Sequence, residues 1–197
     1  MKRRILWLVL AAVLIALAGC GGSDTPVFET SIESEQAIDG DIFQPADGGA
    51  RTVSPAGQNV LVGITAGGEY RSFLSFPLAS LPLNAIIRSA RLTVTLVPPT
   101  NDIPLEMELV SFAPSAGLIE SYYEGLPAYA SAMYSLPVPD INHRVSFNVT
   151  SLVAEAQRRG FDDFQVRIME NLDFSLLGLV EISESNATPP QLTIVYE

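Results

Sequence analysis

The stretch Arg88-Ser89-Ala90-Arg91-Leu92-Thr93-Val94-Thr95-Leu96-Val97 decides the fold class. Apolar and polar side chains alternate along it with a period of two, the pattern of a β-strand with one buried and one solvated face. The apolar face holds Ala90, Leu92, Val94 and Leu96, and the polar face holds Ser89, Arg91, Thr93 and Thr95. The stretch therefore predicts a half-buried strand of an antiparallel sheet.

The same alternation recurs along the chain and predicts many short strands. They fall at about residues 60–64, 70–76, 105–109, 145–149, 164–168, 176–183 and 191–196. One helix is predicted at Ser151–Arg159, with Thr150 as its N-cap and Gly160 in the left-handed conformation at its end. With 14 glycines and 14 prolines for turns, this pattern predicts an all-β, jelly-roll-like β-sandwich with one short helix.

The N-terminus has the features of a secretory signal. Basic residues at 2–4 precede an uninterrupted apolar run from Ile5 to Ala18, which ends at Leu17-Ala18-Gly19-Cys20. This ending resembles the lipobox of bacterial lipoproteins, which implies that Cys20 becomes the lipid-bearing first residue. An uncleaved membrane anchor is the alternative, but about 14 apolar residues fall short of the roughly 20 that span a bilayer.

These features predict three parts: a lipoprotein signal peptide at 1–19, a lipidated tether at 20–28 and one β-sandwich domain at 29–197. The expected location is the bacterial cell envelope, with the protein exported and anchored in a membrane through Cys20. Residue 21 is glycine, not the aspartate that commonly retains lipoproteins in an inner membrane. By resemblance to lipoprotein sorting, the outer membrane or cell surface is favoured.

Charge and cysteine content narrow the partners of the exported body. The chain has 11 basic and 22 acidic residues, and removal of Lys2, Arg3 and Arg4 leaves eight basic residues and a net charge of −14. Such a field repels phosphate polymers, so no nucleic-acid partner is expected. Strongly anionic glycans are also disfavoured unless calcium or a local arginine patch intervenes. The single cysteine leaves no internal disulfide, so stability must come from the core.

The segments Tyr70–Leu78 and Leu81–Leu92 resemble the hallmark of DNRLRE-domain proteins, which are also grouped as carbohydrate-binding module family 96. Residues 145–152 and 183–196 are similar to the family's closing segments, and the resemblance covers about residues 36–197. It implies a β-sandwich on a surface or secreted protein, with binding to polysaccharides such as alginate in some members. Where members commonly carry a tryptophan-containing segment, residues 117–134 offer tyrosines instead.

The candidate binding residues follow from the chemistry of sugars, whose apolar faces stack on aromatic rings. Tyr122, Tyr123, Tyr129 and Tyr134 fall in a stretch rich in glycine, proline and alanine that looks like a long connection. They either form a sugar platform or fasten this loop to the body. Arg71 and Arg91 could assist binding, and the structural alternative for Arg71 is an ion pair with one of the acidic residues.

Metal-binding and catalytic candidates are sparse. Asp39, Asp41 and Asp47 are weak candidates for calcium ligands, and turn formation by their Asp-Gly pairs is the alternative. No cofactor is otherwise expected. His143 is the single histidine, and Asp140 three residues before it suits a turn better than a catalytic triad. We therefore expect no enzyme activity.

The sequence thus predicts a lipid-anchored, non-catalytic binding module of the cell envelope whose ligand is a glycan. The alternative is a structural envelope lipoprotein that docks on a protein partner, for example by sharing a strand edge.

Overall fold

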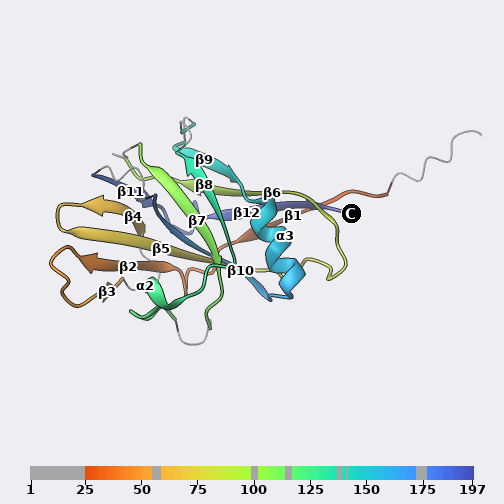
Figure 1. The fold of residues 1–197 in the computed structure, drawn as a ribbon. Helices are drawn as coiled ribbons and strands as arrows, with labels where there is room; N and C mark the ends of the chain where they lie inside the picture. Colours follow the sequence, from red (N-terminus) through yellow and green to blue (C-terminus); the bar gives the residue numbers. More distant parts are fainter. Residues whose placement is uncertain are drawn as a thin grey trace, which may run out of the picture.

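The computed structural model describes residues 25–54, 59–98, 102–113, 117–136, 139–140, 142–171 and 177–197. The predicted signal peptide, Cys20 and most of the tether lie outside these residues. The described part forms two sheets of antiparallel strands that pack face to face (Figure 1). The predicted all-β sandwich is therefore confirmed. Among the described helices, none is long and apolar enough to cross a membrane.

The smaller sheet has four strands in the order β1, β12, β6, β9. Their bounds are Phe28–Glu33, Gln191–Tyr196, Ile87–Thr95 and Arg144–Asn148. Strand β6 corresponds to the strand predicted at residues 88–97 and lies at the centre of this sheet. In it, Leu92 lies opposite both Leu192 and Phe147. Its apolar face is buried as predicted, with Ala90, Leu92 and Val94 at most 2% exposed. The opposite, polar face of this sheet points away from the core.

The larger sheet has the order β11, β4, β5, β10, β7, β8, and β2 pairs with both β3 and β5. In chain order, the strands of this sheet are β2 (Gly40–Pro45), β3 (Thr52–Val53), β4 (Val60–Thr65), β5 (Gly68–Pro77), β7 (Pro104–Val110), β8 (Ala130–Ser135), β10 (Asp163–Glu170) and β11 (Gly178–Ile182). The chain passes repeatedly between the two sheets, for instance from β1 to β2 and from β11 to β12. Connections at the ends of the sandwich therefore hold the sheets together.

The main core fills the space between the sheets. Its largest fully buried side chains include Phe76 and Phe164, whose ring centroids are 6.0 Å apart. Helix α3 (Thr150–Arg159) adds Leu152, Val153 and Ala156 to this core. Alternation along the strands thus delivers one continuous apolar layer, because every second side chain points inward.

The C-terminal end of α3 agrees with the prediction, and its N-terminal end does not. Gly160 ends the helix in the left-handed conformation, with φ of 70°. Thr150, however, is the first helical residue rather than the N-cap, which is Val149. The Thr150 hydroxyl oxygen accepts the backbone N–H of Ala90 in β6 at 2.9 Å. The threonine therefore joins the helix to the smaller sheet instead of capping it.

A second, smaller core lies on the outer face of the larger sheet, beneath the short helix α2 (Tyr122–Gly125). It consists of Ile42, Phe73, Val110, Phe112 and Tyr123. The stretch 117–134 was expected to be a long connection, and this is wrong for its second half, which forms edge strand β8 along β7. Small residues on β8 hid its pattern, because Ala130 and Ala132 pack on the main core with little apolar surface.

Candidate functional site

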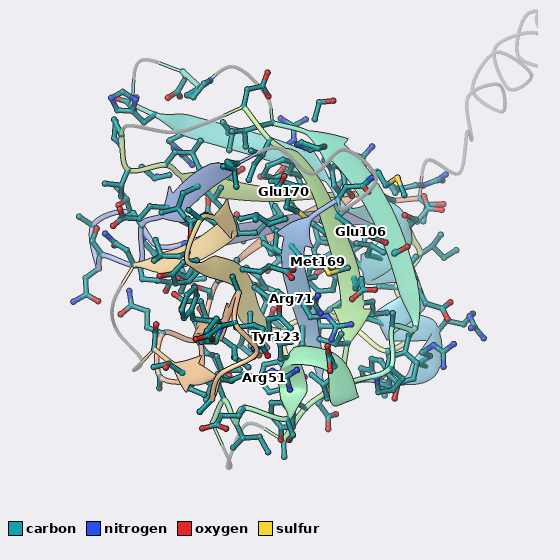
Figure 2. All side chains as sticks on the ribbon, turned by 60° about the vertical axis from the view of Figure 1, so that its left-hand side comes forward. Arg51, Arg71, Glu106, Tyr123, Met169 and Glu170 are labelled. Atoms are coloured by element: carbon teal, nitrogen blue, oxygen red, sulfur yellow. The ribbon has the colours of Figure 1, made fainter. Side chains whose placement is uncertain are left out.

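The side chain of Tyr123, in helix α2, packs against the outer face of the larger sheet and is only 2% exposed. The guanidinium carbons of Arg51 and Arg71 lie 4.6 and 3.9 Å from its ring centroid. Its hydroxyl donates to Glu69 at 2.6 Å, and burial followed by this hydrogen bond raises its pKa. Figure 2 shows Arg51, Tyr123 and Arg71 in succession across this face. The burial of Tyr123 therefore supports the alternative in which it fastens the segment to the body.

Two arginines fasten α2 to the sheet below it. Arg71 pairs with Glu69 at 2.7 Å and donates to the backbone carbonyl of Tyr123 at 2.8 Å. Arg167, which is 5% exposed, pairs with Glu108 and donates to the same Tyr123 carbonyl at 3.0 Å. Arg71 thus has the structural ion pair that was the alternative to a binding role. We call this outer face of the larger sheet the covered face.

The remaining tyrosines of the stretch pack on separate partners. Tyr122 is half-buried against Phe112, with ring centroids 5.6 Å apart. Tyr129 lies edge-on to Phe161 at 5.0 Å, with the guanidinium of Arg159 at 4.6 Å from its ring. Tyr134 is half-buried on β8, and its hydroxyl donates to the carbonyl of Asn148 at 2.7 Å. These contacts support the alternative in which the tyrosines fasten the segment to the body.

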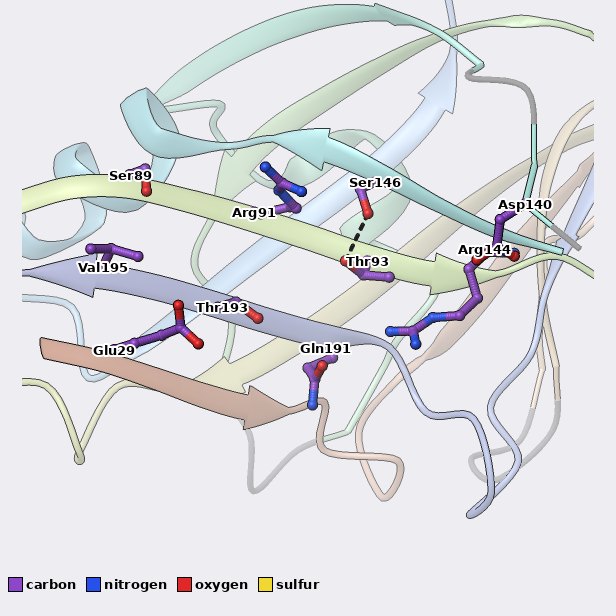
Figure 3. A pocket seen from close by; sticks show the side chains of 10 residues that line it. All are labelled: Glu29, Ser89, Arg91, Thr93, Asp140, Arg144, Ser146, Gln191, Thr193 and Val195. Carbon is purple, nitrogen blue, oxygen red and sulfur yellow. Dashed lines mark hydrogen bonds between the residues drawn. The ribbon is translucent and has the colours of Figure 1, made fainter. Parts of the chain in front are cut away.

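Arg91 lies in a different place, on the outer face of the smaller sheet, which we call the open face. A groove of about 590 Å³ runs over this face and draws side chains from all four strands (Figure 3). Its volume lies within the roughly 300–1,000 Å³ typical of ligand sites. Its lining residues are Glu29, Ser89, Arg91, Thr93, Asp140, Arg144, Ser146, Gln191, Thr193 and Val195.

The groove holds two arginines that differ from all others of the body. Six of its eight arginines have a carboxylate within 4 Å, as in the pairs Arg51–Glu124, Arg71–Glu69, Arg88–Glu197, Arg158–Glu155, Arg159–Glu155 and Arg167–Glu108. Arg91 and Arg144 have no such partner among the described residues, and both side chains are exposed. Their guanidinium groups are therefore available to an external anion.

Sequence reasoning singled out Arg91 but missed Arg144. The signal was present, since Arg144 and Ser146 alternate with Val145 and Phe147 and must share the polar face of that strand. Pairing of β6 with β9 brings the two polar faces together, with Arg91 opposite Asn148 and Thr95 opposite Arg144. The register between these strands was the missing information.

His143 occupies the turn that leads into β9. It has a positive φ of 58°, and its side chain is exposed. One oxygen of Asp140 accepts the backbone N–H groups of Asn142 at 2.7 Å and Arg144 at 2.9 Å. The bond from Arg144 is the main reason why the pKa of Asp140 is lowered. Asp140 thus organises the turn and does not orient the imidazole.

The three candidate calcium ligands have separate partners. Asp47 accepts the backbone N–H of Gly49 at 2.9 Å within an exposed turn. Asp41 is buried and accepts the Ser54 hydroxyl at 2.6 Å and the Leu61 backbone N–H at 3.0 Å. Asp39 is buried and accepts the Ser75 N–H at 2.8 Å. Within the ranges described, no group of three or more His, Cys, Asp or Glu side chains is arranged to hold a metal.

Comparison of the sequence with known proteins finds no protein-family model that matches and no curated protein that matches. The resemblance to DNRLRE-domain proteins therefore remains a prediction. The fold and the groove define the protein as an antiparallel β-sandwich with one covered outer face and one open, polar outer face.

Proposed function

We propose that the protein is a non-catalytic module of the bacterial cell envelope, anchored by a lipid on Cys20, that binds a carboxylate-bearing glycan along the groove of the open face. One observation carries the proposal: the two arginines of the body without an ion pair among the described residues line the same groove.

The lining chemistry suits a sugar acid. Planar guanidinium groups bind carboxylates with two parallel hydrogen bonds, and the hydroxyl groups of Ser89, Thr93 and Thr193 can exchange hydrogen bonds with sugar hydroxyls. No aromatic residue belongs to the lining, so recognition relies on hydrogen bonds and charge rather than on ring stacking. Glu29 and Asp140 also line the groove and balance the charge of the two arginines. Attraction of a sugar carboxylate therefore relies on direct contact with Arg91 or Arg144 and not on a net positive groove.

The shape of the groove suits a chain of sugars. A second hollow of about 210 Å³ shares Thr93, Arg144 and Gln191 with the first and continues toward Thr188. The polar surface therefore extends beyond a single compact pocket. An elongated ligand can occupy both hollows, and Arg144 would contact it where they meet.

The proposed anchor places one end of the sandwich near the membrane. Thr25 lies five positions after Cys20, so the tether between them spans at most about 18 Å. At that end, β1 begins beside the C-terminus (Figure 1). Phe28 lies opposite Tyr196, and the Ile86 N–H donates to the carbonyl of Glu197 at 2.8 Å. Val27, Phe28 and Ile86 are 62%, 51% and 59% exposed. Apolar side chains near a lipid surface support this orientation.

The test is calorimetric titration of the full chain in detergent with oligomers of a polyuronate, compared with neutral oligosaccharides of the same length. We expect binding of the acidic oligomer only. Arg91→Ala and Arg144→Ala should each weaken it by about ten-fold, because each removes a charge-assisted contact of about 1.5 kcal/mol.

Arg158→Ala is the matched control, since Arg158 is exposed on α3 and pairs with Glu155. Its affinity should equal that of the unchanged protein. If no oligosaccharide binds the folded protein, the glycan proposal fails, and docking on an envelope protein becomes the better interpretation. Equal losses in the control and in the groove variants would place the binding surface elsewhere.

A further inference from the structure

Two carboxyl groups and one hydroxyl come together inside the sandwich, away from the groove lining. Ser34 follows β1, Asp39 precedes β2 and Glu184 follows β11. Asp39 and Glu184 are 2% and 3% exposed, and Ser34 is 9% exposed. The Ser34 hydroxyl lies beside both carboxyl groups, and the two carboxyl groups lie beside each other, so the three side chains make weak mutual hydrogen bonds. Two connections distant in sequence, β1 to β2 and β11 to β12, thus contribute to one polar cluster.

None of these mutual contacts has full hydrogen-bond geometry, so four oxygen atoms of the cluster lack a well-formed hydrogen bond in the described structure. They are Oδ2 of Asp39, both carboxyl oxygens of Glu184 and the hydroxyl oxygen of Ser34. A buried polar atom without a partner costs about 1–3 kcal/mol, and more when it is charged. Buried polar groups are therefore nearly always satisfied. These four atoms together indicate a binding partner.

The surrounding protein supplies little compensation. The Ser75 N–H donates to the other oxygen of Asp39 at 2.8 Å. Gln36 donates to the backbone carbonyl of Glu184 rather than to its carboxylate. The half-buried Glu35 is a third carboxylate whose charge acts on Asp39. None of the ion pairs of the described residues reaches Asp39 or Glu184, and the body contains no lysine.

We propose that Asp39, Glu184 and Ser34 bind a divalent cation of the calcium type. Calcium prefers oxygen ligands, accepts carboxylates with one or both oxygens, and tolerates irregular geometry. The four oxygens without a well-formed hydrogen bond supply part of its six to eight ligands, and backbone carbonyls and water supply the rest. Magnesium fits less well because it demands near-ideal octahedral geometry.

The site differs from the calcium site expected from the sequence. Of the three aspartates considered there, only Asp39 takes part, because Asp41 and Asp47 have hydrogen-bond partners of their own. Glu184 lies 145 positions further along the chain and could not be associated with Asp39 before the fold was known.

The position of the site predicts what the cation does. The connection from β1 to β2 and the connection from β11 to β12 each pass between the two sheets. They already touch, since the Ser34 N–H donates to the Pro190 carbonyl at 3.0 Å. A cation held by Ser34, Asp39 and Glu184 would cross-link both connections, in a body that has no internal disulfide.

The test uses the full chain in detergent, stripped with EDTA and dialysed at pH 8 against calcium. We expect one bound calcium per chain by elemental analysis. At a calcium concentration one hundred times Kd, Tm should rise by roughly 5–10 °C. The double variant Asp39→Asn, Glu184→Gln should lose both responses, and its Tm without calcium checks that it folds.

Two further variants complete the test. Asp47→Asn changes an exposed turn carboxylate and should keep the full calcium response. Ser34→Ala removes a neutral ligand and should weaken calcium binding by about ten-fold, which decides the matter if the double variant does not fold. Absence of bound calcium in the unchanged protein, or an unchanged response in the double variant, overturns the proposal in favour of a carboxyl pair that shares protons.

Discussion

The two outer faces of the sandwich use the same side chain in opposite ways. On the covered face, Arg71 and Arg167 are each paired with a carboxylate and bonded to the backbone of α2. On the open face, Arg91 and Arg144 are exposed, without a carboxylate partner in the described part of the chain. Whether an arginine on a strand stabilises the fold or is available for binding can therefore be decided only when its neighbours are known.

The difference follows from what lies above each sheet. The segment that contains α2 brings Tyr123 and its own carbonyl groups onto the larger sheet, so arginines there lose water and need partners. The polar side chains of the smaller sheet instead line a groove. Arginines there remain hydrated, and a ligand can replace the water molecules that contact them. Substitutions on the covered face should therefore affect stability, and substitutions on the open face should affect binding.

The largest effect on stability is expected from Arg167→Ala. It leaves the carboxylate of Glu108 uncompensated in a largely buried position, which should lower the free energy of unfolding by about 3–5 kcal/mol. Denaturant titration measures this loss. The double variant Arg167→Met, Glu108→Leu should recover most of it, because no unpaired charge remains. A loss below about 1 kcal/mol in the single variant would contradict the structural role of the covered face.

Tyr123→Phe should have an intermediate effect. It keeps the ring between Arg51 and Arg71 but removes the hydroxyl that donates to Glu69, at a cost of about 1.5–2 kcal/mol. Tyr134→Phe is the matched control, since the Tyr134 hydroxyl meets an uncharged carbonyl near solvent and should cost about 0.5 kcal/mol. Equal losses in the two variants would show that the buried charge network adds nothing.

The smallest effect on stability is expected from the double variant Arg91→Ala, Arg144→Ala. The free energy of unfolding should change by no more than about 0.5 kcal/mol, because neither side chain has an ion pair to lose among the described residues. Thermal and denaturant unfolding measure this directly. A loss above about 1.5 kcal/mol would mean that these arginines stabilise the fold, and the contrast between the two faces would collapse.

The architecture followed from the sequence wherever a strand carried large apolar residues at every second position. Strands β4, β6, β7, β9 and β10 were predicted for this reason, and so was the left-handed end of α3 at Gly160. Strand β8 was missed because alanine contributes little to an apolar pattern. Local alternation is reliable when the buried side chains are large, since their burial then dominates the energy of the strand.

The sites depended on contacts between distant parts of the chain. Nothing in the sequence around Glu108 indicates a partner, yet β10 places Arg167 directly opposite it. Tyr123 was a candidate for sugar stacking, yet Arg51 and Arg71 enclose its ring. Neither outcome could be predicted from local pattern, because a polar or aromatic side chain finds its partner across strands and not along them.

By itself, the sequence determined the fold class, because a period of two in polarity is a property of consecutive residues and each strand must bury one face. Only the tertiary structure decided which polar residues are available. Strand pairing brings Arg91 and Arg144 over one groove, and the connections between the sheets bring Ser34, Asp39 and Glu184 together. Such groups meet only when the chain closes on itself, since what a polar side chain can do depends on which atoms surround it.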